Sequence, residues 1–109
     1  MTTAITPGII DEMVRRLVER FDPLRVILFG ACARDEIGPD SDVDLFVIMP
    51  DGTDTRQAAV RMLNALADAG VPKDVLVGTP DTLARLGDAP GLIYRTVLKE
   101  GKSLYERST

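Results

Sequence analysis

The sequence predicts a small α/β domain in which a β-sheet is flanked by helices. Three observations support this prediction. The chain has 109 residues, a length typical of one domain, so we expect a single domain over residues 1–109. Short continuous apolar runs, typical of buried strands, alternate with segments in which apolar residues recur at helical spacing. Glycines and prolines occur between these segments, and the sequence contains no internal repeat or long linker.

The first half of the chain is predicted to contain one helix and two strands. Thr6 followed by Pro7 is typical of a helix N-cap, and apolar residues then recur at helical spacing until Asp22. The apolar run 26–29 predicts a buried strand that ends at the following glycine. A polar loop follows, and a second strand is expected from about residue 42 to residue 49.

The second half is predicted to contain a long helix, a third strand and two shorter helices. The expected bounds are 53–69 for the long helix, 71–77 for the strand, and starts near 80 and 90 for the short helices. Thr53 or Asp54 is the expected cap of the long helix, and Gly70 is its C-terminal stop. The last helix stops at Gly101 and is followed by a short apolar tail at 104–105.

The composition excludes several classes of function. The net charge is −4 and the 13 lysines and arginines are scattered among 17 acidic residues, so direct binding to nucleic acid is not expected. The single cysteine gives no disulfide framework, and the lack of histidine excludes histidine-based triads and zinc sites. No signal peptide is seen, and no apolar run approaches the ~20 residues of a membrane span, so we expect a cytoplasmic protein without a membrane partner. Because histidine is absent, acid–base or metal chemistry in this protein must use carboxylates.

Three aspartates are spaced for a shared metal site. Asp42 and Asp44 open the second strand two residues apart, so both lie on one face of the sheet, ~6.5–7 Å apart at Cα. The long helix after this strand favours a right-handed parallel crossover, which places Asp74, an acid inside an otherwise buried strand, beside them. Because like charges repel, a pair of Mg²⁺ ions with oxygen ligands is a natural way to neutralise this group.

Other interpretations of these aspartates fit the sequence less well than a metal site. A D-x-D pattern alone is most often solvated surface, and Asp74 alone could be a strand-start or edge residue. Residues 40–44 resemble the opening of an EF-hand calcium loop, but Leu45 occupies the position that needs glycine, and Asp51 replaces the final glutamate. Aspartyl phosphatases of the haloacid dehalogenase kind carry D-x-D after an apolar strand, whereas here it comes before one. The order and spacing of the three acids favour the metal site.

The segment LFGACARDEIGPDSDVDLFVI, with a later KDVLV, resembles the minimal nucleotidyltransferase (MNT) family of the DNA polymerase β superfamily. That family's motif is Gly-Ser, ten residues, then D-x-D, often written LFGSRARG…SDIDLLV. Here Gly30 is in place, ten residues run from Cys32 to Ser41, and Asp42 and Asp44 follow in register. The last segment, IYRTVLKEGKSLYER, is similar to the usual end of such proteins. The resemblance covers nearly the whole chain and implies a polymerase-β-like fold with a small mixed sheet flanked by helices.

The resemblance implies a role for each matching residue. Asp42 and Asp44 would hold two Mg²⁺ ions, or Mn²⁺, that carry ATP or another nucleoside triphosphate. Asp74 would be the third carboxylate, which binds the catalytic metal and helps activate an attacking hydroxyl. The expected nucleotide-binding residues are Gly30, Ala31, Arg34 and Ser41. The glycine of this set would let the triphosphate approach the backbone closely.

Two residues depart from the family pattern. Ala31 stands where the family has serine, so a hydroxyl contact to a phosphate is missing, and Asp35 replaces a glycine and adds negative charge. A hydrogen bond to a charged group is worth roughly 1.5–3 kcal/mol, so nucleotide affinity or rate is expected to fall by about ten- to a hundredfold. Arg34 either steadies a phosphate or pairs with a neighbouring acid, and Cys32 is interpreted as a small turn residue.

The resemblance also implies a protein partner. Family members of this size lack the helical domain that larger nucleotidyltransferases use to hold an acceptor, and they commonly act as antitoxins beside a helical HEPN ribonuclease toxin. The leading hypothesis is a Mg²⁺-dependent adenylyltransferase that transfers AMP from ATP to a hydroxyl of such a toxin. The alternative is a catalytically weakened binding module that neutralises its partner by occlusion alone.

Overall fold

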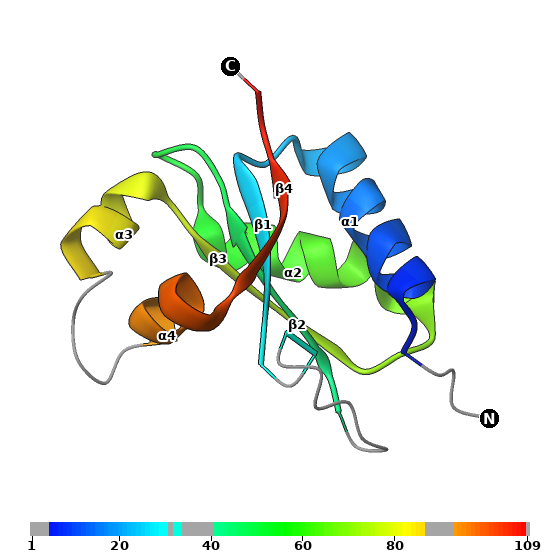
Figure 1. Ribbon diagram of the computed structural model, residues 1–109. Coiled ribbons are helices and arrows are strands. Elements are labelled where there is room, and N and C mark those ends of the chain that lie inside the picture. The colour runs from blue at the N-terminus through cyan, green and yellow to red at the C-terminus, as the bar shows by residue number, and fades with distance from the viewer. Residues whose placement is uncertain (1–4, 31, 34–40, 87–92, 109) are drawn as a thin grey trace.

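The chain folds into a four-stranded sheet with helices on both faces (Figure 1). The computed structural model describes residues 5–30, 32–33, 41–86 and 93–108. In chain order the elements are α1 (Pro7–Phe21), β1 (Arg25–Phe29), β2 (Val43–Ile48), α2 (Thr55–Ala65), the 3₁₀ helix η1 (Ala67–Ala69), β3 (Lys73–Gly78), α3 (Pro80–Leu86), α4 (Ile93–Glu100) and β4 (Lys102–Glu106). The predicted α/β class with a small sheet is confirmed.

The sheet is mixed, with strand order β3-β2-β1-β4. β1 is antiparallel to both of its neighbours, β2 and β4, whereas β2 and β3 are parallel. Helix α2 connects the parallel pair, as the long crossover predicted. Backbone hydrogen bonds from Val43 N to Pro72 O and from Met49 N to Gly78 O, both 2.9 Å, extend the pairing of β2 with β3 at its two ends. β2 and β3 are therefore held in a fixed register along their whole length.

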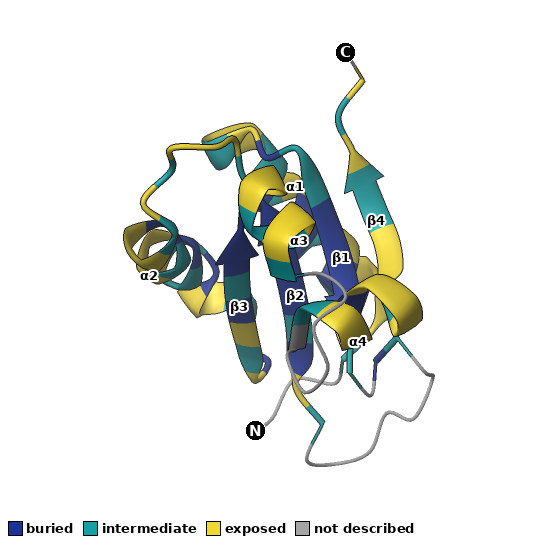
Figure 2. Ribbon diagram, turned by 90° about the vertical axis from the view of Figure 1, so that its left-hand side faces the viewer, coloured by how far each residue is buried: buried dark blue, intermediate teal, exposed yellow. Residues whose placement is uncertain are grey.

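Alternation along β2 divides its side chains between two apolar cores. One core lies under α1 and α2 and includes Val43, Leu45 and Val47 of the strand. The other lies under α3 and α4 and includes Phe46 of the strand with Val97 of α4. Figure 2 shows β1 and β2 as the most buried strands, with β4 and much of α4 exposed. The central strands β1 and β2 are thus packed on both faces, and this packing holds the residues at their ends in place.

Helix α1 begins and ends where the sequence predicts. The Thr6 hydroxyl caps it by accepting a hydrogen bond from Ile9 N at 3.2 Å. Asp22 ends it in the left-handed conformation, with φ 50°, and its N–H donates to Val18 O at 3.1 Å. The buried face consists of Ile10, Met13, Val14 and Leu17, which recur at helical spacing.

The predicted long helix consists of two parts. Asp54, rather than Thr53, caps α2, because its carboxylate accepts a hydrogen bond from the backbone N–H three residues later (3.1 Å). The α-helix ends at Ala65, where the N–H of Leu66 is shared between the carbonyls three and four residues before it. Such sharing tightens the last turn, and η1 then continues to Gly70, whose φ is 80°.

The third strand differs from its prediction in position and environment. It covers residues 73–78 rather than 71–77, and it lies at the edge of the sheet, where its described partner is β2. Asp74 is therefore exposed and does not lie inside a buried strand. An edge position leaves this carboxylate open to solvent on one side.

The apolar tail at the end of the chain forms a strand that the sequence pattern did not predict. β4 pairs with β1, with an irregularity in register between Val26 and Ile27. Leu104 and Tyr105 are half-buried, and the rest of the strand is exposed. Two apolar residues among charged ones give too weak an alternation to predict a strand, and the open edge of β1 supplies the pairing. The predicted start of the last helix, at 89–91, lies outside the described residues; within them, no helix is long and apolar enough to cross a membrane.

Candidate functional site

The structure brings the three aspartates together at one end of the parallel strand pair. Asp44 is the second residue of β2 and lies directly opposite Asp74, the second residue of β3. Neighbouring strands are about 4.8 Å apart, so these two carboxylates share one short stretch of sheet. Asp42 comes just before β2 and lies on the same face as Asp44, because side chains alternate along a strand. On the other side of β2, Asp44 is opposite Phe29.

The three aspartates form one electrostatic group with Asp44 at its centre. Burial raises the pKa of Asp44 above its ordinary value of 3.8, and the charges of Asp42 and Asp74 raise it further. Asp44 is half-buried, whereas Asp42 and Asp74 are exposed. Desolvation and like charge therefore both disfavour the ionised form of Asp44.

Gly30 packs directly against the central carboxylate. It follows β1 with φ 74°, a conformation that side chains other than glycine rarely adopt. A Cβ atom at this position would lie 2.5 Å from Oδ2 of Asp44, closer than real contacts allow. The sequence resemblance assigns Gly30 to the triphosphate, and the structure adds a second requirement, room for the side chain of Asp44.

Cys32 connects the turn after β1 to the start of the acidic group. Its thiol donates a hydrogen bond to the carbonyl oxygen of Asp42 (3.3 Å), and the residue is 5% exposed. Burial raises the pKa of the thiol, and the charges of Asp44 and Asp42 raise it further. A buried, protonated thiol is a poor nucleophile, which agrees with the interpretation of Cys32 as a turn residue. Its contact with Asp42 could not be predicted from the sequence.

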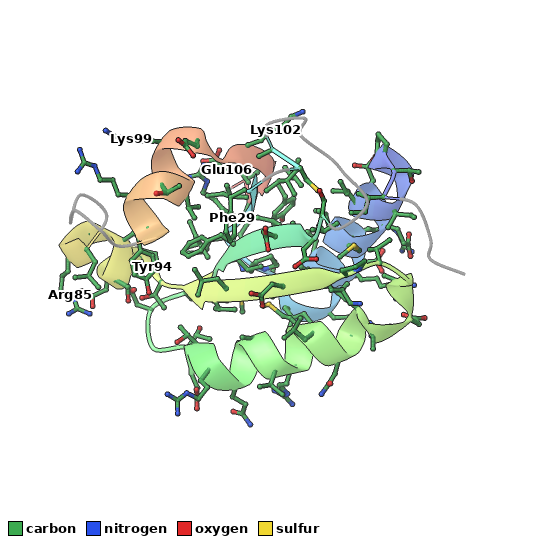
Figure 3. The ribbon with its side chains drawn as sticks, turned by 90° about the horizontal axis from the view of Figure 1, so that it is seen from below. Phe29, Arg85, Tyr94, Lys99, Lys102 and Glu106 are labelled. Atoms are coloured by element: carbon green, nitrogen blue, oxygen red, sulfur yellow. The ribbon has the colours of Figure 1, made fainter. Side chains whose placement is uncertain are left out.

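An aromatic surface continues from the aspartates toward α4. Phe29, Leu76 and Tyr94 are half-buried and pack against the core on this face. The ring of Tyr94 meets that of Phe46 edge-on, with centroids 5.8 Å apart. Figure 3 shows Phe29 and Tyr94 on the side of the sheet that α4 covers. The sequence marks these residues only as apolar, because the pattern does not tell that they lie on the same face of the sheet as the acids.

The remaining predicted site residues are only partly described. Ser41 is half-buried and immediately precedes Asp42. Ala31 and Arg34, together with Asp35, lie outside the described residues.

The donor chemistry of the three aspartates fits Mg²⁺. Carboxylate oxygens are its preferred protein ligands, and a bound cation would remove the repulsion that raises the pKa of Asp44. Within the described residues, however, no three acidic or cysteine side chains are arranged to hold a metal ion as they stand. Asp74, for example, uses Oδ1 to accept a hydrogen bond from Val75 N (2.9 Å).

Comparison with known proteins identifies the family. A sequence model of the nucleotidyltransferase domain matches residues 10–104, which is most of the chain. The chain belongs to the nucleotidyltransferase domain family. No curated protein matches the sequence.

Solved structures share the nucleotidyltransferase fold with this domain. The crystal structure of an inferred nucleotidyltransferase from Sulfolobus solfataricus aligns with a TM-score of 0.62 and 17% identity, covering 92% of this domain and 79% of that chain. A crystal structure of a toxin–antitoxin with AMP-PNP aligns with a TM-score of 0.56 and 21% identity, covering 90% of this domain and 74% of that chain. At these identities the likeness is one of fold, and it agrees with the mixed sheet of the nucleotidyltransferase domain described above.

Proposed function

We propose that this nucleotidyltransferase domain transfers AMP from ATP to a hydroxyl group of a partner protein, with Mg²⁺ as its cofactor. The observation that carries the proposal is the register of Asp44 with Asp74, which, with Asp42 nearby, gives three carboxylates at one end of a parallel strand pair. Membership of the nucleotidyltransferase family supports a nucleotide substrate. The AMP-PNP of the toxin–antitoxin neighbour supports ATP as the nucleotide.

The proposed reaction is a displacement at the α-phosphorus of ATP. The acceptor oxygen forms a new bond to this phosphorus, the bond to the bridging oxygen of the β-phosphate breaks, and pyrophosphate leaves. Asp42, Asp44 and Asp74 would hold Mg²⁺, which when bound neutralises the triphosphate and stabilises the charge that develops during transfer. Asp74 is exposed at the edge of the sheet, so it is accessible to an acceptor hydroxyl and would take its proton and release it to water.

We further propose that the acceptor is a toxin of the HEPN ribonuclease type, for which this domain acts as antitoxin. Two of the three carboxylates are exposed, and an acceptor on the surface of another protein needs this access. A structural neighbour that comes from a toxin–antitoxin supports this class of partner.

The direct test is the intact mass of a HEPN partner after incubation with the domain, ATP and Mg²⁺. The expected result is a mass increase of one AMP unit per modified site, which chelation of the metal prevents. The matched controls are Asp42→Asn and Asp74→Ala, neither of which should modify the partner. Neutralisation of the partner's ribonuclease activity should follow the modification; neutralisation without any mass change would contradict the proposal.

The alternative is that the domain neutralises its partner by occlusion alone. The sequence feature that favours it is Ala31, which stands where the MNT pattern has serine. This alternative predicts no AMP transfer, and neutralisation that survives both Asp42→Asn and Asp74→Ala. Transfer and neutralisation measured on the same proteins therefore separate the two functions.

Ala31→Ser is expected to raise the rate of AMP transfer by up to about ten- to a hundredfold. The added hydroxyl would restore one hydrogen bond to a charged phosphate, worth roughly 1.5–3 kcal/mol. Transfer is measured by intact mass over time, and the control is Ala31→Ser combined with Asp74→Ala, which should lose the gain. A rate for Ala31→Ser equal to that of the original protein would mean that the hydroxyl makes no such contact.

Millimolar Mg²⁺ or Mn²⁺ together with ATP is expected to raise the unfolding temperature of the domain. A ligand that binds only the folded state at ten times its Kd adds about 1.4 kcal/mol to the free energy of unfolding. The combined variant Asp42→Asn and Asp44→Asn should fold and lose this response, as measured by thermal unfolding with and without both ligands. An unchanged response in the double variant would place the binding site elsewhere.

A further inference from the structure

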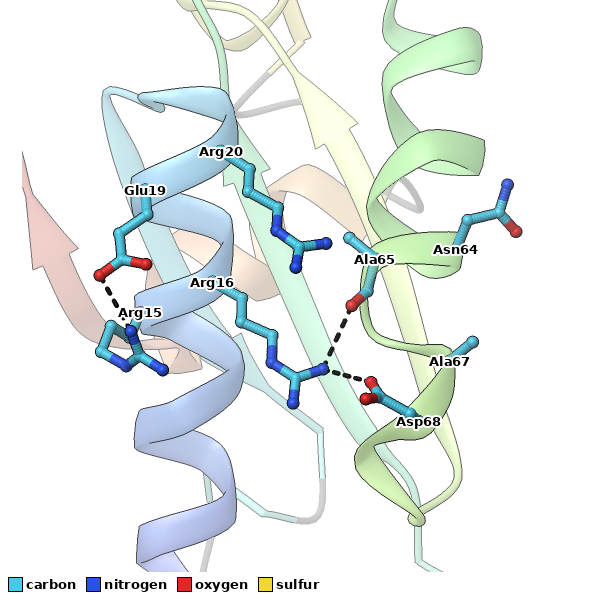
Figure 4. A pocket seen from close by; sticks show the side chains of 8 residues that line it. All are labelled: Arg15, Arg16, Glu19, Arg20, Asn64, Ala65, Ala67 and Asp68. Carbon is cyan, nitrogen blue, oxygen red and sulfur yellow. Dashed lines mark hydrogen bonds and ion pairs between the residues drawn. The ribbon is translucent and has the colours of Figure 1, made fainter.

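A basic groove lies between α1 and the C-terminal end of α2, on the face of the sheet opposite to the three aspartates (Figure 4). It consists of two adjoining hollows of about 400 and 510 Å³ that share three lining residues. We name it the arginine groove and define it by Arg16, Arg20, Phe21, Arg61, Asn64 and Ala65. The overall charge of the chain is −4, so this concentration of arginine stands out against an acidic protein.

One part of the groove is neutralised by acids of the protein itself. Arg16, whose side chain is 23% exposed, pairs with Asp68 and donates a hydrogen bond to the carbonyl of Ala65 (3.3 Å), so it connects α1 to α2. Next to it, Arg15 pairs with Glu12 at 2.6 Å and with Glu19 at 2.9 Å. These two arginines are therefore neutralised within the protein and do not need a ligand to balance their charge.

Arg20 and Arg61 lie in the other part of the groove, and both are exposed. Neither side chain takes part in a hydrogen bond or ion pair with another residue that the structure describes. The hydrogen bond from Arg16 lowers the pKa of Asp68, and the charge of Arg20 helps to lower it. In Figure 4 the Arg20 side chain extends from α1 toward α2. Asn64, one turn after Arg61 on α2, adds an amide that can donate further hydrogen bonds. Two arginines from different helices thus line one hollow.

One apolar residue, Phe21, lines the hollow of Arg20 and Arg61, and another, Val60, precedes Arg61 in the sequence and lies outside the hollow. Val60 is 54% exposed on the outer side of α2, one turn before Asn64. Phe21, at the end of α1, is half-buried and lines the hollow. Arginine and aromatic side chains are enriched in surfaces that bind other proteins, where an apolar anchor and a paired charge act together.

We propose that the arginine groove is a docking site for an acidic segment of a partner protein. Two carboxylates of the segment pair with Arg20 and Arg61, and an adjacent apolar side chain packs on Val60. A nucleic acid fits less well, because Arg20 and Arg61 are only two charges, whereas a continuous row of phosphates needs a longer row of cations. The occupant is therefore a short run of carboxylates rather than a polyanion.

A partner docked here leaves the opposite face of the sheet uncovered. The three aspartates lie on that other face, so docking and chemistry use separate surfaces. The inference requires only a protein partner and does not depend on AMP transfer. Loss of docking and loss of transfer can therefore be observed separately.

The test uses a fluorescein-labelled peptide with paired glutamates beside a leucine, titrated with the whole chain and followed by fluorescence anisotropy. Arg20→Glu with Arg61→Glu is expected to weaken peptide binding by about tenfold or more. The matched control, Arg85→Glu with Arg95→Glu, makes the same change of net charge in the layer of α3 and α4 and should leave binding unchanged. Asp42→Asn should also bind the peptide normally, which separates this site from the aspartates.

Further variants and competition experiments decide whether the proposal is supported or overturned. Arg20→Gln with Arg61→Gln should lose peptide binding as well, which shows that the loss does not come from misfolding caused by charge reversal. Val60→Ser should weaken binding of the leucine peptide but not of a peptide with serine in place of the leucine. Equal loss in the control pair, or no peptide binding at low salt, would overturn the proposal. So would equal competition by a DNA of matched charge. Self-association of the chain that the Arg20 and Arg61 changes abolish would assign the groove to a second copy and also overturn it.

Discussion

Asp44→Asn is expected to abolish AMP transfer and, at neutral pH, to make the fold more stable. The carboxylate is central to the acidic group, so its removal should lower the rate by on the order of 10³-fold or more, since metal and charge stabilisation supply several kcal/mol. Asparagine keeps the shape of the side chain beside Gly30 and removes the charge that burial and two neighbouring carboxylates disfavour. A residue whose loss stabilises the protein while abolishing activity is one retained for function.

The stability effect has a defined dependence on pH. The pKa of Asp44 in the folded state is raised above its ordinary value of 3.8, so the folded protein favours the protonated group. The contribution of this group to the free energy of unfolding is therefore greatest below pH 3.8 and is lost as the pH rises through the raised pKa. The gain from Asp44→Asn should be full at pH 7 and should shrink as the pH is lowered toward 3.8. Thermal unfolding over this range measures it.

The control for Asp44 is Asp11→Asn, a change of the same kind at an exposed position of α1. It should leave both AMP transfer and the unfolding temperature unchanged. Retained transfer in Asp44→Asn would remove this residue from the proposed mechanism. A lower unfolding temperature at pH 7 would mean that the carboxylate has a structural partner that outweighs its repulsion.

Gly30→Ala is expected to lower the free energy of unfolding by about 2–4 kcal/mol. Left-handed backbone at a residue other than glycine costs roughly 1–2 kcal/mol, and the new Cβ would also lie 2.5 Å from Oδ2 of Asp44. Relief of that contact would displace the carboxylate, so AMP transfer should fall as well. Denaturant unfolding and intact-mass assays measure the two effects.

Gly52→Ala is the matched control for Gly30→Ala. Gly52 has φ 91° but no atom within 4 Å of the position of its Cβ, so it isolates the cost of the backbone conformation. Its expected loss is about 1–2 kcal/mol. Gly30→Ala combined with Asp44→Ala should recover part of the loss of Gly30→Ala. Equal losses at the two glycines would show that the contact with the carboxylate has no energetic weight.

The arrangement of the acidic group could be predicted because it follows from sequence order and strand geometry. The two-residue spacing of Asp42 and Asp44 places them on one face, and the long helix between β2 and β3 favours a parallel pair, which brings Asp74 beside Asp44. The exposure of Asp74 could not be predicted. Its apolar neighbours indicate a buried strand, whereas the strand order places β3 at the edge.

Features that depend on contacts between distant segments could not be predicted. The hydrogen bond from Cys32 to Asp42 joins two sides of a turn, and nothing in the local pattern identifies it. The pairing of β4 with β1 depends on an open edge far away in the sequence. The arginine groove is similar, because Arg20 and Arg61 are ordinary surface residues until packing places their helices side by side.

The pairing of β4 with β1 has a consequence for how the chain folds. Only α2 and η1 lie between β2 and β3 in the chain, so the strand pair with the aspartates can form early from nearby segments. β1 then keeps one edge open until residues 102–106 reach it from almost the other end of the chain. Contacts between distant segments form slowly, and an unpaired strand edge is a template for association with other chains. During synthesis and refolding, the open edge of β1 is therefore exposed to aggregation, and anything that delays β4 prolongs that risk.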